Sequence, residues 1–246
     1  DIEDFKFTGD DRVALHNIQF TLKQGETLGI VGKTGSGKTA ILKLLMREFE
    51  GYRGTIMYGD HSIVAYKKRA LREAIGYVPQ DHFLFSTTVA GNIAFANADA
   101  TMDEIYEAAR LANIHEDILQ FTDGYNTIVG ERGVSLSGGQ KQRISIARAL
   151  MMKPELLILD DSLSAVDART EEAILESLKK SRTDETTIIT SHRLSAIAHA
   201  HQIIVMNEGT IIEKGTHEEL MELKGMYYEM YQLQQLENLV EKGRDV

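Results

Sequence analysis

The sequence predicts an α/β fold with a largely parallel sheet. Strand-like apolar runs alternate along the chain with stretches of helical spacing, an order that places helices between parallel strands. A second observation is a long stretch, residues 81–152, whose pattern is mostly helical. We therefore expect this stretch to be a helical subdomain inserted between two strands of the core.

The N-terminal part contains the first expected strands and the first helix. Residues 13–22 alternate roughly and residues 27–31 are apolar, with the turn residues 23–26 between them. We expect an antiparallel β portion here. Apolar residues then recur at the spacing of a helix, at Ile41, Leu42, Leu44 and Leu45.

The rest of the chain divides into a core, an insertion and a tail. Further strand-like runs are residues 54–57, 75–78, 156–159, 186–190 and 202–206. Further helices are expected at residues 102–112, 137–151, 171–180 and 218–223. We expect residues 1–80 and 153–230 to form the core, residues 81–152 the inserted subdomain, and residues 231–246 a C-terminal tail, whose polar residues 232–246 fray.

Charge and composition narrow the class of protein. The chain has 246 residues, with 27 Lys and Arg against 37 Asp and Glu, so its net charge of −10 argues against a nucleic-acid surface. Cysteine is absent, which excludes disulfides and thiolate metal sites. No apolar run is long enough to span a membrane, and residues 1–4 lack the basic and apolar regions of a signal peptide. Without an initiator methionine, the chain is expected to be a segment of a longer polypeptide.

Residues 32–39 carry the strongest motif. They read Gly-Lys-Thr-Gly-Ser-Gly-Lys-Thr, which fits G-x-x-x-x-G-K-[ST] between an apolar strand and an apolar-periodic helix. Backbone N–H groups of such a loop and the helix N-terminus bind phosphate oxygens. Lys38 is the expected ligand of the β- and γ-phosphates, and the Thr39 hydroxyl that of Mg²⁺. The residues expected to line the phosphate site are Gly32, Thr34, Gly35, Ser36, Gly37, Lys38 and Thr39. A plain glycine-rich turn is the alternative.

Two carboxylates, Asp160 and Asp161, follow the apolar run 156–159. Asp160 is expected to hold Mg²⁺ through water, although many core strands end in an acidic residue that binds no metal. Asp161 could polarise the attacking water if its side chain reaches that water. An Asp carboxylate lies about 1.5 Å short of a Glu carboxylate on the same backbone. Misplacement on that scale can cost on the order of 100-fold in rate.

Leu136-Ser137-Gly138-Gly139-Gln140 resembles the signature of ATP-binding cassette (ABC) proteins. The resemblance covers nearly the whole chain, because Gln80 matches the family's Q-loop, residues 164–167 its D-loop and Ser191-His192-Arg193 its switch histidine. It implies a P-loop NTPase (RecA-like) core that hydrolyses ATP with Mg²⁺.

The resemblance also implies roles for these residues. Gln80 would ligate Mg²⁺ and His192 would contact the γ-phosphate or the attacking water. In the family each nucleotide lies between the phosphate loop of one subunit and the signature of another, so a second cassette is the expected partner. Asp167 would contact the partner across the dimer, or else is an ordinary helix N-cap. Read alone, Ser137 before glycines is a plain helix N-cap, and a lone histidine is usually a surface or core residue.

Phe7 corresponds to the aromatic residue that the family stacks on adenine. The alternative is a strand aromatic packed inward.

Three segments resemble the exporter branch of the family, in which such segments contact transmembrane domains: Phe83-Leu84-Phe85, Gly91-Asn92-Ile93 and Glu131-Arg132-Gly133. This implies transmembrane domains in the same full-length polypeptide and a place at the cytoplasmic face of the cell membrane.

Asp161 departs from the family, which normally carries Glu there. The chain thus resembles the degenerate-site half of a heterodimeric multidrug exporter, which binds ATP well and hydrolyses it slowly. A homodimer in which Asp161 works through a shifted water is the alternative. Two further classes stay open, a soluble cassette ATPase of translation or DNA repair and a regulatory module that binds ATP without turnover.

Overall fold

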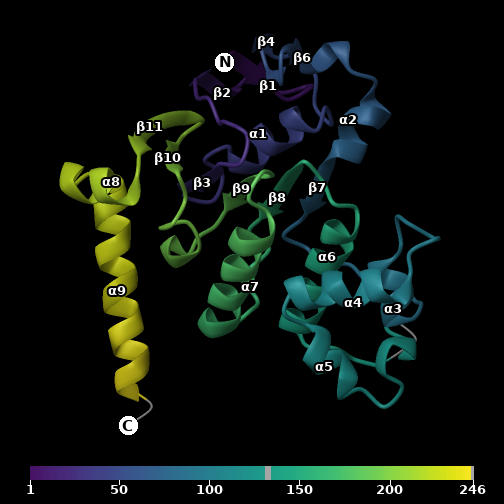
Figure 1. Ribbon diagram of the computed structural model, residues 1–246. Coiled ribbons are helices and arrows are strands. Elements are labelled where there is room, and N and C mark those ends of the chain that lie inside the picture. The colour runs from purple at the N-terminus through teal and green to yellow at the C-terminus, as the bar shows by residue number, and fades with distance from the viewer. Residues whose placement is uncertain (131–133, 245–246) are drawn as a thin grey trace. The chain divides into compact units, whose positions relative to one another are not determined.

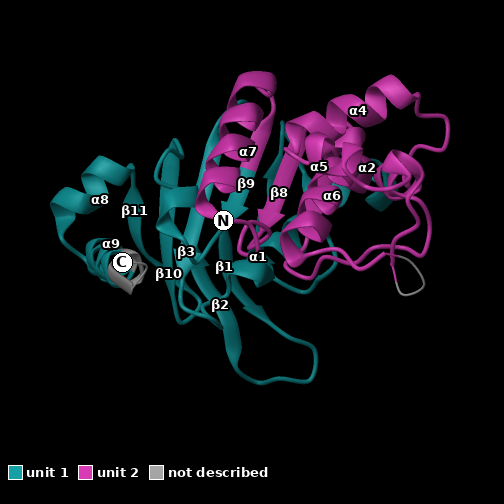
Figure 2. Cartoon of the chain, turned by 90° about the horizontal axis from the view of Figure 1, so that it is seen from below, with its two compact units in different colours: residues 1–71, 188–246 teal, residues 72–187 magenta. Residues whose placement is uncertain are grey.

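The computed structural model describes residues 1–130 and 134–244. The chain folds into two compact units, residues 1–71 with 188–246 and residues 72–187, which Figure 2 shows in teal and magenta. Both units are mixed α/β with parallel pairing among buried strands, which confirms the predicted fold class.

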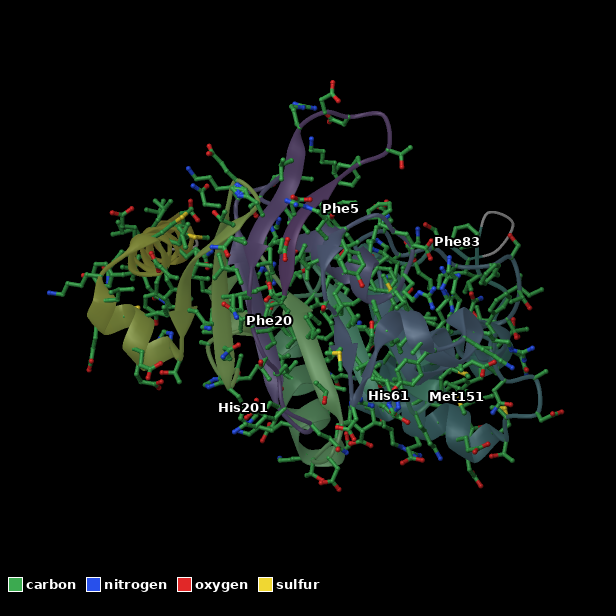
Figure 3. The ribbon with its side chains drawn as sticks, turned by 90° about the horizontal axis from the view of Figure 1, so that it is seen from above. Phe5, Phe20, His61, Phe83, Met151 and His201 are labelled. Carbon is green, nitrogen blue, oxygen red and sulfur yellow. The ribbon has the colours of Figure 1, made fainter. Side chains whose placement is uncertain are left out.

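The first unit starts with an antiparallel β portion, as predicted. β1 (Ile2–Lys6) lies between β2 (Val13–Ile18) and β4 (Arg53–Gly54). Phe5 of β1 is opposite Leu15 of β2, and both side chains are buried, which gives this sheet its apolar face (Figure 3). The strand expected at residues 54–57 is instead two short strands, β4 and β5 (Met57–Tyr58), and β5 pairs with β6 (His61–Ser62).

The parallel strands of this unit are apolar on both faces. β3 (Thr27–Gly32) pairs in parallel with β10 (Gln202–Asn207), in register from Leu28 and Gln202 onward. Their central residues are fully buried, as expected for strands covered on both sides. β9 (Thr186–Thr190) is the other neighbour of β3, and β11 (Thr210–Gly215) pairs antiparallel with β10.

Gly209 closes the tight turn between β10 and β11. Its φ is +78°, and a Cβ built there would lie 2.4 Å from the carbonyl oxygen of Ala14. The turn therefore requires glycine both for its backbone angle and for the close approach of β2. β11 was not among the strands expected from the sequence.

Both chain segments of the first unit contribute helices. They are α1 (Lys38–Leu45), the short η1 (Ile63–Ala65) and η3 (Leu194–Ala196), α8 (His217–Leu223) and α9 (Met226–Arg244), of which α1, α8 and α9 are labelled in Figure 1. α2 (Lys68–Ala74) crosses the sequence boundary between the two units.

Residues 231–244, expected as a polar tail, are part of α9, whereas the fraying of this tail stays a prediction. The Glu213 carboxylate accepts hydrogen bonds from the backbone N–H groups of Met226 and Tyr227, and Tyr227 is fully buried. An anion at the first turn and a buried aromatic anchor stabilise the helix from its start. A local polarity pattern does not reveal either contact.

The second unit combines two parallel strands with most of the helices. β7 (Ile75–Val78) pairs with β8 (Leu156–Asp160), and Val78 is opposite Leu159. The helical segments are α3 (Val89–Ile93), α4 (Met102–Leu111), α5 (His115–Leu119), η2 (Gly124–Asn126), α6 (Gly138–Met151) and α7 (Ala168–Ser181). The unit is wider than the subdomain expected at residues 81–152, because β7, β8 and α7 group with the helices; that narrower subdomain stays a prediction.

Buried aliphatic residues of α3, α4 and α6 form the helical core of this unit. Ile93, Ala109 and Ile144 have no exposed surface. No described helix is both long and apolar enough to cross a membrane.

The capping box at the start of α4 predicts how much a helix cap contributes to the stability of the chain. The Thr101 hydroxyl accepts from Glu104 N, and the Glu104 carboxylate accepts from Thr101 N. Thr101→Ala should lower the free energy of unfolding by about 1 kcal/mol, because it removes the cap. Thr101→Ser keeps the hydroxyl and should recover most of the loss. Urea unfolding followed by circular dichroism measures both; equal stability of the two variants would contradict the capping role.

Candidate functional site

The predicted phosphate loop lies in the first unit, where it joins β3 to α1. Lys38 is almost completely buried, and its Nζ donates to the carbonyl oxygens of Gly32 at 2.7 Å and Lys33 at 3.1 Å. The ammonium group thus lies over the loop backbone. Thr34, Gly35 and Thr39 are exposed on the loop and the first turn of α1.

The glycines at both ends of this loop are required by close packing. A Cβ at Gly32 would lie 2.3 Å from the Met206 carbonyl oxygen, and one at Gly37 would lie 2.6 Å from Leu15 Cδ2. Gly37 also has a φ of +103° and is the N-cap of α1, with no side-chain cap. The start of α1 therefore presents its first-turn amides without a competing capping oxygen.

These features fit a bound polyphosphate. The Ser36 hydroxyl is buried, and its Oγ has no hydrogen-bond partner among the described residues. It stands in the same loop as the Lys38 ammonium group and the uncapped helix start, three kinds of donor that suit phosphate oxygens. The Thr39 hydroxyl belongs to the oxygen ligands that Mg²⁺ prefers.

The two predicted carboxylates lie in the second unit, at the end of β8. Asp160 is 4% exposed and its Oδ2 accepts a hydrogen bond from the Tyr77 hydroxyl at 3.0 Å. Asp161 is 7% exposed and has a φ of +47°, an uncommon angle outside glycine that Asp tolerates better than most residues. Its Oδ2 accepts from Gln80 Nε2 at 3.3 Å. Parallel pairing of β7 with β8 brings these four side chains together, because both strands end at the same edge.

The turn after β8 fixes Asp161 further. Its carbonyl oxygen accepts hydrogen bonds from Ser164 N at 3.4 Å and Ser164 Oγ at 2.9 Å. A carboxylate beside a carboxamide and a neighbouring carboxylate could orient a water or share a metal ion.

The predicted signature segment is also in the second unit, at the start of α6. Ser137 is the N-cap: its Oγ accepts from Gln140 N at 3.2 Å, and Gln140 Oε1 accepts from Ser137 N at 3.0 Å. Ser137 is therefore a helix N-cap, and its role toward a nucleotide stays a prediction. Gly139 lies close to residues 164–167, the segment that resembles the D-loop, since a Cβ at Gly139 would lie 3.0 Å from the Ala165 carbonyl oxygen. Gly138 has ordinary packing space.

Asp117 of α5 holds the first turn of α6 in place, a role that no motif indicates. Its carboxylate accepts two hydrogen bonds from the Arg143 guanidinium, at 2.9 and 3.0 Å, and one from Gln140 Nε2 at 3.4 Å. Burial alone would raise the pKa of Asp117, but the hydrogen bonds and charge of Arg143, with Gln140, lower it overall. No sequence signal links residues 117 and 143, because the pairing depends on the tertiary packing of α5 against α6.

His192 is exposed in the first unit, directly after β9, in agreement with its expected place at a strand end. Asp160 and Asp161 belong to the other unit. No motif points to Gln234 of α9, whose Nε2 donates to the His192 carbonyl oxygen. Asp167 caps α7 by accepting from Arg169 N and Thr170 N, so its N-cap reading is confirmed.

Phe7 is not packed inward. It is 41% exposed just after β1, with edge-to-face contacts to Phe5 at 5.1 Å and Phe49 at 5.4 Å between ring centroids. The inward position belongs to Phe5, which is 2% exposed. Adenine stacking by Phe7 stays a prediction.

The segments that resemble the exporter branch are partly described. Asn92 is fully buried and its side chain bonds both the N–H and the carbonyl of Phe85, which fixes the loop after β7. Phe83 of that loop is 63% exposed (Figure 3). Glu131-Arg132-Gly133 lies outside the described residues.

Comparisons with known proteins agree on one family. A family model described as ABC transporter matches residues 15–164. The chain is 52% identical, over 93% of its length, to the probable multidrug resistance ABC transporter ATP-binding/permease protein YheI of Bacillus subtilis (strain 168), of which it covers 39%. It is 50% identical, over 96% of its length, to the multidrug resistance-like ATP-binding protein MdlA of Escherichia coli (strain K12), of which it covers 40%.

A solved structure gives the same result. The structure of a bacterial Atm1-family ABC exporter with ATP bound matches with a TM-score of 0.91 and 39% identity, over 95% of this chain and 41% of that one. The chain thus spans about two fifths of the length of these relatives.

The contacts of Asp117 predict that its negative charge stabilises the start of α6. Asp117→Asn should lower the free energy of unfolding by about 1–3 kcal/mol, because it leaves the largely buried Arg143 guanidinium without its counter-charge. Glu116→Gln, a neutralisation at the exposed neighbouring position, is the matched control and should change little.

This difference should depend on pH. The folded-state pKa of Asp117 is lowered, so its stabilisation is present above the unfolded value and is lost as the pH falls through the folded value. Chemical unfolding at pH 7 and near pH 3 measures the effect. A gap between wild type and Asp117→Asn that does not shrink in acid would contradict the ion pair.

Proposed function

The chain belongs to the ABC transporter family and is an ATPase domain of it, and on that premise we propose that its ATP turnover powers export of a substrate across a membrane. The single observation that carries the proposal is the loop between β3 and α1. There the buried Lys38 ammonium group, the unpartnered Ser36 hydroxyl and the uncapped start of α1 occur together.

We infer that ATP·Mg²⁺ is held by the phosphate loop and by residues at or just after the ends of β7 and β8. Lys38, Ser36 and the loop amides would bind the phosphates, and Thr39, Asp160 and Gln80 would supply oxygen ligands for Mg²⁺. When bound, the nucleotide supplies the γ-phosphoryl group that is transferred to water, and Mg²⁺ neutralises its charge. Tyr77 orients the Asp160 carboxylate through its hydroxyl, so that one carboxylate oxygen is already engaged by protein.

Asp161 is the proposed weak point of the chain's own site. Its carboxylate is directed to the Gln80 amide at 3.3 Å and is one methylene shorter than a glutamate. We infer that it holds the attacking water poorly, which leaves ATP binding intact and slows hydrolysis. His192 would contact the γ-phosphate or that water.

A second nucleotide-binding domain is the proposed partner, with Ser137, Gly138, Gly139 and Gln140 facing the partner's ATP. α6 begins at Gly138, and the dipole at its N-terminus favours an anion. Because the slow site is the one built on Lys38, the partner with the better carboxylate would be a non-identical chain. A homodimer in which Asp161 works at full rate is the competing possibility.

The contact to transmembrane domains is proposed at the loop after β7. Phe83 and Phe95 are more than half exposed, and Phe85 stacks on Phe95 with ring centroids 3.9 Å apart. An exposed aromatic cluster suits a protein interface. With such a contact the domain would work at the cytoplasmic face of the membrane.

Replacement of Asp161 by glutamate tests the proposed function. At high protein concentration, Asp161→Glu should raise the steady-state rate of ATP hydrolysis by roughly 10- to 100-fold, because the longer side chain reaches the water. Lys38→Ala in the same background is the control and should abolish the gain.

Each outcome has a defined meaning. A large gain supports a slow site that needs a better partner. Equal and substantial rates in both proteins would contradict the slow-site proposal and favour the homodimer. No hydrolysis in either protein, with ATP bound, would favour a regulatory module.

A further inference from the structure

One side chain of α9 holds the backbone on both sides of Arg193. Gln234 Oε1 accepts a hydrogen bond from Leu194 N at 2.9 Å, and its Nε2 donates to the His192 carbonyl oxygen at 2.5 Å. Arg193 is in the extended conformation, with φ −92° and ψ 119°. In extended chain the carbonyl of one residue and the N–H two residues later point to the same side. The Gln234 amide thus takes the place that a neighbouring strand would occupy.

The other end of this segment is fixed by β3. Ser191 N donates to the Ile30 carbonyl oxygen at 3.3 Å, and Ser191 Oγ accepts from Arg193 N at 2.9 Å. Ser191 and Leu194 are buried, whereas the His192 side chain between them is exposed. His192 therefore extends from a backbone segment that is tied down on both sides.

The position of Gln234 is itself determined by the start of α9. Tyr227 is fully buried, its hydroxyl is 2.8 Å from His217 Nδ1, and the Glu213 carboxylate accepts from its N–H. Gln234 is seven positions after Tyr227, which is about two helical turns. Both side chains therefore lie on the same face of α9. Beyond Gln234 the apolar residues Leu236 and Val240 are exposed. The packed part of the helix thus extends as far as the His192 segment.

We propose that Gln234 is a positioning residue for His192, and that α9 acts on ATP hydrolysis through this one side chain. The inference rests on the proposed function, in which His192 contacts the γ-phosphate or the attacking water. Loss of Gln234 removes one hydrogen bond from the peptide group on each side of Arg193 and loosens the backbone that directs the imidazole. Such a change affects the chemical step and leaves the phosphate loop around Lys38 untouched.

Steady-state kinetics of the chain provides the first test. Gln234→Ala should lower kcat by roughly tenfold with little change in KM for ATP, because nucleotide binding depends on other residues. Gln234→Glu keeps the acceptor for Leu194 N but loses the donor to the His192 carbonyl, and should be as slow as the alanine variant or slower. Gln235→Ala, at the exposed neighbouring position, is the matched control and should behave as wild type. An unchanged kcat in Gln234→Ala overturns the proposal.

A second measurement does not depend on turnover. The imidazole ¹H–¹³C signal of His192, assigned by its absence in His192→Ala, should shift or broaden in Gln234→Ala and stay unchanged in Gln235→Ala. An unaltered signal in Gln234→Ala overturns the positioning role even if the protein hydrolyses ATP. If the signal shifts but the wild-type protein hydrolyses no ATP, the contact between Gln234 and the His192 segment is supported. The proposed function is then contradicted instead.

Discussion

Parallel pairing of buried strands is the constraint on which the rest of the structure depends. β3 and β10 in the first unit, and β7 and β8 in the second, consist mostly of buried apolar residues. Polar residues are therefore displaced to the strand ends. In each unit the carboxyl ends of parallel strands lie at one edge, so the residues that follow them gather there. The phosphate loop follows β3, and the two carboxylates end β8 beside the Gln80 segment.

Much of this arrangement could be predicted from the sequence because it is local. The strands at residues 75–78 and 186–190 were predicted with the bounds that the structure shows, and Ser137 as an N-cap follows from a pattern of four residues. The phosphate loop has glycines where its backbone contacts Met206 and Leu15. The glycines of this local motif are therefore required by contacts with residues distant in the sequence.

The parts that could not be predicted depend on distant contacts. α9 looks like a polar tail, yet Glu213 and the buried Tyr227 secure its start from outside the segment. Tyr77 bonds Asp160 and Asp117 bonds Gln140, both residues of predicted motifs, but the partners are 83 and 23 positions apart in the chain. Gln234 acts on a segment 40 residues away. Periodicity and motif spacing contain no information about such pairs, since they depend on which elements pack together.

Under the proposed function, the short side chain of Asp161 separates ATP binding from ATP hydrolysis. The residues proposed to bind phosphate and Mg²⁺ do not include it, and its own backbone is held by Ser164 in the turn after β8. In the proposal, the missing methylene increases the distance from the carboxylate to the attacking water. On this proposal, the domain keeps its affinity for ATP and depends on a partner domain for fast hydrolysis.

The central claim is that the Lys38 loop and the Asp160 carboxylate serve one nucleotide. The most direct test is calorimetric titration of the chain with ATP, with and without Mg²⁺, in wild type, Lys38→Ala and Asp160→Asn. We predict that Lys38→Ala weakens binding in both conditions, whereas Asp160→Asn removes the gain in affinity that Mg²⁺ provides and leaves metal-free binding unchanged. If Asp160→Asn kept the full Mg²⁺ dependence of wild type, Asp160 would not serve the nucleotide that Lys38 binds, and the claim would be wrong.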